Sequence, residues 1–186
     1  MNKKVIVING VGTCGKDTFV EFFKKYSKSN VRLISTVDDV KMILKEMGWD
    51  GKTKDVKTRK ALHDIKMVWT EYNNGVFNGI KEAINEHSLK RETIFFVMCR
   101  EPEEIRKFKD YYRSSCTTLL VKRDSAVVKG NYADESVYDY AYDVIIDNNG
   151  TLSQLEDSAK LFIEELKKSD EAFDRDLQQK LFLNDL

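Results

Sequence analysis

The stretch that decides the fold class runs from Lys3 to Thr18 and reads KKVIVINGVGTCGKDT. Its first part, Lys3 to Asn9, is rich in β-branched residues, which is typical of a strand covered on both faces in a parallel sheet. A glycine-rich segment follows at once, and residues 15 to 28 then place apolar side chains along one helix face. The stretch therefore predicts a buried strand, a glycine loop and a helix in immediate succession.

Three residues of the glycine loop satisfy the spacing G-x-x-x-x-G-K, which is the motif of a loop that binds nucleotide phosphates: Gly10, Gly15 and Lys16. Glycines let the backbone curl so that N–H groups point at phosphate oxygens, and the helix N-terminus adds positive charge. Lys16 is expected to reach the β- and γ-phosphates. We expect ATP to be bound by Gly10, Val11, Gly12, Thr13, Cys14, Gly15, Lys16, Asp17 and Thr18.

Asp17 stands where this motif usually has the Ser or Thr that binds Mg²⁺. A carboxylate is a good oxygen ligand for Mg²⁺, so Asp17 can replace the hydroxyl, and Thr18 can supply one if the register differs slightly. The alternative is that Asp17 is only a first-turn acid that interacts favourably with the helix dipole. We expect Mg²⁺ as a cofactor, with Asp17 and Thr18 as its candidate ligands.

Beyond this stretch, strands alternate with helices over a chain of 186 residues, which predicts a single α/β domain, 1–186, with a parallel sheet. Further strands are expected at Val31–Thr36, Thr93–Cys99, Thr117–Lys122 and Tyr142–Asp147. Helices are expected at Val37–Met47, near Asp55–Tyr72 and Asn74–His87, after Pro102, from about Thr151, and as a charged tail over 170–186.

Composition narrows the partners and the compartment. The 31 basic and 31 acidic side chains cancel, so neither nucleic acid nor an anionic membrane is an expected partner. No apolar run approaches the length needed to cross a bilayer. The three cysteines, Cys14, Cys99 and Cys116, are too scattered for a C-x-x-C motif, which favours reduced thiols and a cytoplasmic protein.

The string G-K-D-T (15–18), followed by an apolar helix, resembles the bacteriophage-type deoxynucleoside monophosphate kinases and the animal-type phosphomevalonate kinases. VMCREPEEIRKF (97–108) is similar to their strand-arginine-helix segment, and YDVIIDNNGTLSQL (142–155) to the last strand and turn of nucleotide and dephospho-coenzyme A kinases. The resemblance implies a three-layer P-loop NTPase fold with five parallel strands ordered 2-3-1-4-5. It also implies a core over about 3–168, a helical acceptor-binding insert over about 37–90 and a short lid over about 123–138.

The same resemblance suggests roles for residues outside the loop. Arg100 matches the arginine that grips the acceptor's phosphate; the alternative is a salt bridge to Glu103 or Glu104. Arg123 opens the lid, where cations neutralise charge on the transferred phosphoryl group; the alternative is a solvated surface charge. Asn148 resembles the loop that contacts adenine, although an Asn-Gly-Thr turn starting a helix explains it equally well.

Two further features stay open in the sequence. Met98 stands where these kinases often have an acid that helps to hold Mg²⁺, and Asp38, Asp39 or Glu101 can substitute for it. In the insert, Arg59 and Tyr72 are the preferred acceptor contacts, against charged solvated helix faces with aromatic residues in the core. The remaining candidates there are Lys41, Lys57, Lys60, Lys66 and Trp69.

These features predict an ATP-dependent phosphotransferase whose acceptor is a nucleoside or deoxynucleoside monophosphate, with Lys16, Arg100 and Arg123 assisting the transfer. One alternative is a kinase of another phosphorylated metabolite, similar to phosphomevalonate or dephospho-coenzyme A kinases. Another is a nucleotide-binding regulatory protein with little turnover, which the absence of an acid at Met98 favours. A GTPase is disfavoured because VKRD (121–124) lacks the Asn or Thr of the guanine-reading N/T-K-x-D motif. The oligomeric state is left open.

Overall fold

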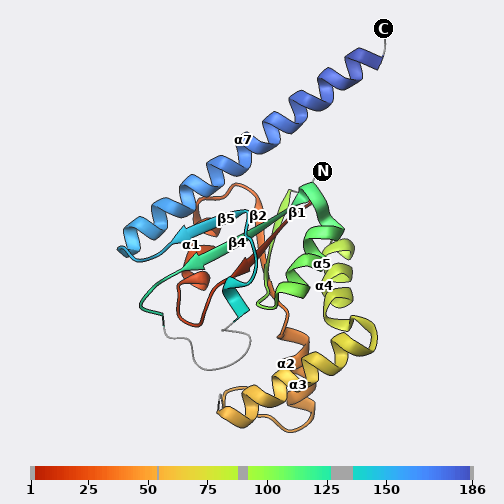
Figure 1. The fold of residues 1–186 in the computed structure, drawn as a ribbon, viewed down its shortest axis with the longest axis vertical. Coiled ribbons are helices and arrows are strands. Elements are labelled where there is room, and N and C mark those ends of the chain that lie inside the picture. Colours follow the sequence, from red (N-terminus) through yellow and green to blue (C-terminus); the bar gives the residue numbers. More distant parts are fainter. Residues whose placement is uncertain (1–2, 54, 88–91, 127–135, 185–186) are drawn as a thin grey trace.

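The computed structural model describes residues 3–53, 55–87, 92–126 and 136–184, which form a parallel sheet with helices on both faces (Figure 1). Its strands are β1 (Lys3–Asn9), β2 (Asn30–Ser35), β3 (Thr93–Met98), β4 (Cys116–Lys122) and β5 (Val144–Asp147). Its helices are α1 (Lys16–Tyr26), α2 (Asp38–Glu46), α3 (Val56–Asn73), α4 (Gly75–Glu86), α5 (Pro102–Tyr112) and α7 (Leu152–Asn184), with two 3-10 turns, η1 (Arg113–Ser115) and η2 (Ser136–Tyr138).

The five strands are ordered β2-β3-β1-β4-β5 and all pairs are parallel, which confirms the predicted fold class. β1 is central: Ile8 lies opposite Met98 on β3 and opposite Leu119 on β4. Parallel neighbours end at the same edge of a sheet, so the segments that follow β1, β3 and β4 meet there. This edge is where α/β sheets bind their ligands.

Alternate residues of the central strand enter two separate cores. Ile6 shares a buried cluster with Phe23 of α1 and Phe162 of α7. Val7 belongs to a second cluster, which contains Phe108 of α5 together with residues of α4. Figure 1 shows the corresponding layers, with α1 and α7 on one face of the sheet and α4 and α5 on the other. The continuous apolar run of β1 is therefore explained by burial on both faces.

Helices α2, α3 and α4 fill the connection between β2 and β3. Asp55 caps α3 by accepting a hydrogen bond from the backbone N–H of Thr58 at 2.7 Å, and Asn74 ends it in a left-handed conformation. Lys66 of α3 contacts Glu101 and Thr36, which follow β3 and β2. The helical segment is thereby held against the ligand-binding edge of the sheet.

The C-terminal part of the chain differs from its prediction. A single helix, α7, spans Leu152–Asn184, whereas the sequence predicted a helix ending near residue 168 and a separate tail helix. No Gly or Pro lies within residues 152–184, so no backbone feature ends the helix at the Ser169-Asp170 step. Of the predicted lid, 123–138, residues 127–135 lie outside the described residues.

The helices of the described ranges include none that is long and apolar enough to cross a membrane.

Candidate active site

The glycine loop lies between β1 and α1 and is pressed against the ends of β4 and β5. Gly10 has φ 148° and Gly15 has φ 103°, both in the region that only glycine adopts readily. A Cβ atom on Gly10 would lie 2.4 Å from the carbonyl oxygen of Val121, and one on Gly15 would lie 2.4 Å from the amide nitrogen of Asn148. The loop conformation therefore requires glycine at both motif positions.

Lys16 directs its amine into this loop. The side chain is 9% exposed, and Nζ donates hydrogen bonds to the carbonyl oxygens of Gly10 and Val11 at 2.5 and 3.0 Å. Burial lowers the pKa of Lys16, and the positive charge of Arg100 lowers it further, while the neighbouring Cys14 thiol acts in the opposite direction. Two cations thus lie near one another at the loop, an arrangement that favours a polyanionic ligand.

Asn9, the last residue of β1, connects the loop to the neighbouring strand ends. It is fully buried and accepts the backbone N–H of Gly10 at 2.7 Å through Oδ1. Its Nδ2 donates to the carbonyl oxygen of Arg100 at 3.0 Å and to the hydroxyl of Tyr142 at 2.6 Å. Tyr142 in turn donates to the carbonyl oxygen of Val137, which belongs to η2.

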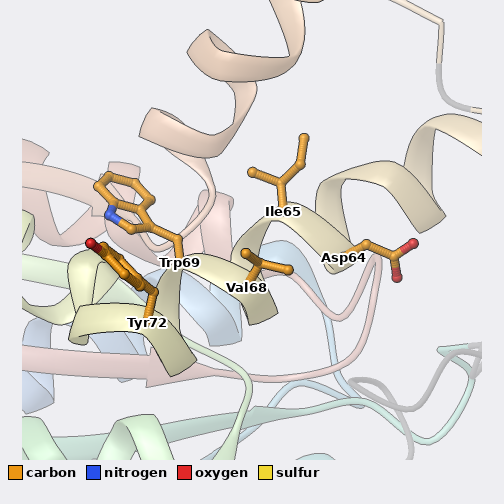
Figure 2. Close-up of a pocket in the computed structure, with 5 residues that line it drawn as sticks. All are labelled: Asp64, Ile65, Val68, Trp69 and Tyr72. Atoms are coloured by element: carbon orange, nitrogen blue, oxygen red, sulfur yellow. The ribbon is translucent and has the colours of Figure 1, made fainter.

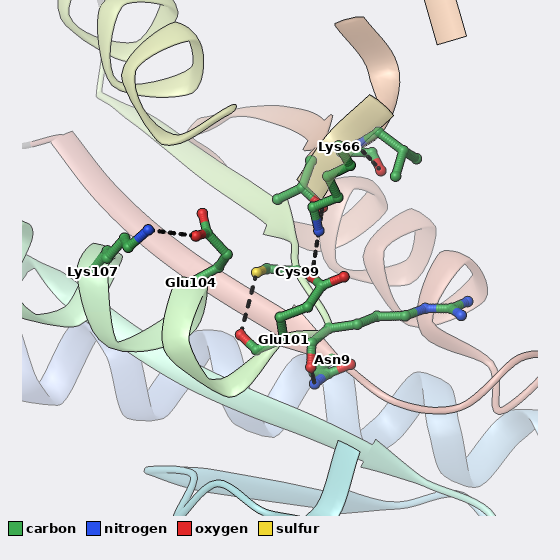
Figure 3. Close-up of polar contacts among 10 residues, drawn as sticks. Asn9, Lys66, Cys99, Glu101, Glu104 and Lys107 are labelled. Atoms are coloured by element: carbon green, nitrogen blue, oxygen red, sulfur yellow. Dashed lines mark hydrogen bonds and ion pairs between the residues drawn. The ribbon is translucent and has the colours of Figure 1, made fainter. Parts of the chain in front are cut away.

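Arg100 follows β3 and is half-buried, and the acids that come after it are engaged by other cations (Figure 3). Glu101 pairs with Lys66, Glu103 with Arg106, and Glu104 with Lys107 at 2.6 Å. The glutamates that sequence reasoning offered as salt-bridge partners of Arg100 therefore have partners on α5 itself. Their negative charge is balanced locally, which leaves the guanidinium suited to an anion.

Asp17 and Thr18 lie in the first turn of α1, with Asp17 exposed and Thr18 partly buried. Nowhere in the described part of the chain do three His, Cys, Asp or Glu side chains gather as a metal site. Mg²⁺ that arrives with a nucleotide needs only one or two protein oxygens, because the phosphates supply others. The two residues fit that kind of metal, and their role as its ligands stays a prediction.

The acid that might replace the one missing at Met98 is not evident. Met98 packs against the buried cluster of α1 and α7. Asp38 pairs with Lys41 at 2.9 Å and accepts the N–H of Ser35, and Glu101 is held by Lys66. Two of the three proposed substitutes are thus bound by lysines.

Asn148 supports the loop from the end of β5. It is 6% exposed, and Nδ2 donates to the carbonyl oxygen of Cys14 at 2.8 Å. Its backbone N–H donates to the carbonyl oxygen of Lys122 at 2.7 Å, which joins the ends of β4 and β5. Asn148 therefore shapes the nucleotide loop, and its predicted contact with adenine stays a prediction.

Arg123 lies directly after β4, on the opposite side of β1 from Arg100. It is exposed, and its Nε donates to the hydroxyl of Ser125 at 3.1 Å. Its position at the ligand-binding edge suits a lid cation, and that role stays a prediction.

The candidate acceptor residues of α3 face different directions. Trp69 and Tyr72 line an apolar surface pocket of about 370 Å³ together with Ile65, Val68 and Asp64 (Figure 2). Tyr72 is 84% exposed, whereas Trp69 packs against Gly75 and the second core. Lys66 instead points toward the sheet edge and is 4% exposed. The structure therefore brings Lys66, and not Tyr72, into contact with the segment that carries Arg100.

Comparison with known proteins gives matches in structure and none in sequence. No family model and no curated protein matches the chain. A gluconokinase from Sinorhizobium meliloti 1021 matches with a TM-score of 0.52 and 12% identity, over 92% of this chain and 97% of that one. The chain has the P-loop kinase fold.

Two further structures match with TM-scores below 0.5. The shikimate kinase from Bacteroides thetaiotaomicron has a TM-score of 0.48 and 15% identity, over 88% of this chain and 98% of that one. The Mycobacterium tuberculosis APS kinase CysC in complex with AMPPNP and APS has 0.47 and 10%, over 89% and 98%. Identities this low describe a shared fold and leave the substrate open.

Within this P-loop kinase fold, sequence reasoning missed Asn9 and the Lys66–Glu101 pair. A signal for Asn9 was present, because a polar residue ends an otherwise apolar buried strand directly before the loop. The Lys66–Glu101 pair joins residues 35 positions apart. No local pattern indicates such a contact.

Proposed function

We propose that the protein is an ATP-dependent kinase of a small phosphorylated acceptor, and that the acceptor is a nucleoside or deoxynucleoside monophosphate. One observation carries this proposal. Lys16 in the glycine loop and Arg100 after the adjacent strand are close enough for Arg100 to lower the pKa of Lys16, and Asn9 connects their backbones. This arrangement suits two phosphate groups, one on each side.

The chemistry needs no protein nucleophile. An oxygen of the acceptor's phosphate attacks the γ-phosphorus of ATP, the bond to the β–γ bridging oxygen breaks, and ADP leaves. The protein contributes by holding both groups in line and by placing cations near the developing charge. Mg²⁺ bound with the nucleotide would neutralise part of that charge, with Asp17 and Thr18 as the residues that would hold it.

A phosphorylated acceptor is favoured over a neutral one by the surroundings of Arg100. The guanidinium can form two parallel hydrogen bonds to a phosphate, and the acids that follow it are already paired. Gluconokinase and shikimate kinase, which match in fold, are named for acceptors without a phosphate. Whether the acceptor carries a phosphate is therefore the point that the experiment has to decide.

The test is a screen of ADP formation with Mg-ATP, using three groups of acceptors. These are nucleoside and deoxynucleoside monophosphates, other phosphorylated metabolites such as phosphomevalonate and dephospho-coenzyme A, and the unphosphorylated acids gluconate and shikimate. We expect turnover with a monophosphate, and none with the Lys16→Ala variant. Turnover with an unphosphorylated acid alone would refute the phosphorylated acceptor. ATP binding without any turnover would favour a nucleotide-binding regulator.

A further inference from the structure

A buried ion pair lies beside the proposed acceptor arginine. Lys66, on α3, is 4% exposed and contacts the carboxylate of Glu101, whose side chain is 18% exposed (Figure 3). The Lys66 amine also donates to the hydroxyl of Thr36 at 3.2 Å. The pair thus joins the helical segment to the turns that follow β2 and β3.

Glu101 acts on Arg100 through the backbone and through its charge. Its carboxylate accepts hydrogen bonds from the backbone N–H groups of Arg100 and of Glu101 itself. Burial alone would raise the pKa of Glu101, but the charge and hydrogen bond of Lys66 outweigh burial and hold the pKa below its usual value. A carboxylate therefore stands in the residue next to Arg100 at neutral pH.

An ionised Glu101 without Lys66 would oppose the binding of phosphate at Arg100. Its carboxylate would repel the anion, and it would also be free to turn toward the neighbouring guanidinium and occupy it. Lys66 cancels this charge and holds the carboxylate in a fixed direction. With Asn9 bonded to the carbonyl oxygen and Glu101 to the N–H, the backbone of Arg100 is fixed on both sides.

We propose that Lys66 is a positioning residue of the acceptor site, which acts by neutralising Glu101 so that Arg100 remains available to the acceptor's phosphate. This role rests on the proposed function, because it requires an acceptor that carries a phosphate. The competing explanation is that the pair only attaches α3 to the sheet. In that case its two members would be equivalent, since removing either one breaks the same ion pair.

The two single variants separate these explanations. Lys66→Met leaves the carboxylate of Glu101 beside Arg100, whereas Glu101→Gln leaves the positive charge of Lys66 there. Both variants break the pair and should lower stability. Only Lys66→Met should weaken phosphate binding, while Glu101→Gln should leave it unchanged or strengthen it. The double variant Lys66→Met/Glu101→Gln removes both charges and should restore binding.

The measurement is a calorimetric titration of the full chain with inorganic phosphate as the probe, with Mg-AMPPNP present in saturating amounts to fill the glycine loop. We expect Lys66→Met to raise the phosphate Kd about 10-fold or more, the scale of losing a charged hydrogen bond. Lys66→Arg and the double variant should stay within about threefold of the unmodified protein. The affinity for Mg-AMPPNP should change less than about twofold in all variants, and thermal unfolding identifies any that do not fold.

Arg100→Ala serves as the control for the site itself. If this variant binds phosphate as the unmodified protein does, the proposed acceptor site is wrong, and the role of Lys66 is refuted with it. If Arg100→Ala weakens binding but Lys66→Met and Glu101→Gln act alike, the pair is only structural and the inference fails alone. Should Lys66→Met not fold, the double variant decides, because the inference requires it to bind phosphate and Glu101→Gln to bind it at least as tightly.

Discussion

Asn9 donates its side-chain amide to the carbonyl oxygen of Arg100 at 3.0 Å, across 91 positions of sequence. The same side chain accepts the N–H of Gly10, the first residue of the glycine loop. One fully buried amide therefore sets the distance between the loop proposed to hold ATP and the arginine proposed to hold the acceptor. A change at Asn9 should disturb both substrates at once.

Asn9→Ala is expected to lower the free energy of unfolding by about 1–3 kcal/mol, because buried partners lose their hydrogen bonds. It should also raise the KM of both ATP and the acceptor. Tyr142→Phe is the matched control, since it removes one hydroxyl from the network and leaves the Asn9–Arg100 bond in place. Urea unfolding and two-substrate kinetics measure these effects. A change in only one KM would contradict the shared role of Asn9.

Gly10→Ala and Gly12→Ala should differ sharply in stability. A Cβ on Gly10 would lie 2.4 Å from the Val121 carbonyl oxygen, at a φ of 148°, whereas a Cβ on Gly12 meets no atom within 4 Å. We expect Gly10→Ala to cost at least about 1–3 kcal/mol and Gly12→Ala to stay within about 0.5 kcal/mol. Thermal unfolding without nucleotide measures both, and equal stabilities would show that the loop has another conformation.

Asp17→Ala is expected to affect nucleotide binding mainly when Mg²⁺ is present. Asp17 is exposed in the first turn of α1, where it can reach a metal carried by the phosphates or simply favour the helix dipole. A metal ligand predicts a larger loss of affinity for Mg-ATP than for ATP with a chelator. Calorimetry under the two conditions measures this difference, and equal losses would support the dipole role.

Arg100→Ala should act on the acceptor and hardly on ATP. Losing a charged hydrogen-bond partner costs about 1.5–3 kcal/mol, or roughly 10- to 150-fold in kcat/KM for the acceptor. The KM of ATP should stay within about twofold. Arg106→Ala is the control, because Arg106 follows in the same segment and pairs with Glu103 on the surface of α5. If Arg106→Ala has the same effect, the charge of the whole segment matters and not the contact of Arg100.

Glu101→Gln should lower stability at neutral pH, and the difference from the unmodified protein should vanish in acid. The pKa of Glu101 is lowered in the folded protein, so its contribution is complete above the usual glutamate value of about 4.3 and is lost as the pH falls below it. Breaking a buried pair costs about 3–5 kcal/mol. Urea unfolding at pH 7 and pH 3 measures the difference, and a constant difference would show that Glu101 is not ionised in the fold.

Much of the fold was predictable because its signals are local. β1 spans the predicted residues, and β3 and β4 differ from their predictions by one residue at an end, since buried strands are apolar runs bounded by polar segments. Pro102 begins α5 as expected. The strand order came from the resemblance of the motifs, because strand pairing in a parallel sheet depends on contacts between distant segments.

The parts that the sequence did not predict depend on distant contacts. Asn148 was expected at adenine, yet its amide bonds to Cys14, 134 residues away. Lys66 was one of several lysines on a charged helix, and only the packing of α3 against the sheet edge distinguishes it. The length of α7 was misjudged for the opposite reason, because a charged Ser169-Asp170 step was taken as a boundary although nothing there breaks a helix.

The two cores on either side of β1 have a consequence for evolution. One core holds α1 and α7 with the glycine loop, and the other holds α4 and α5 with the helical segment that leads to Lys66. Substitutions that repack one face of the sheet leave the side chains of the other face in place, because neighbouring strand residues point in opposite directions. A lineage of such proteins can therefore exchange one acceptor for another while its grip on the nucleotide is inherited unchanged.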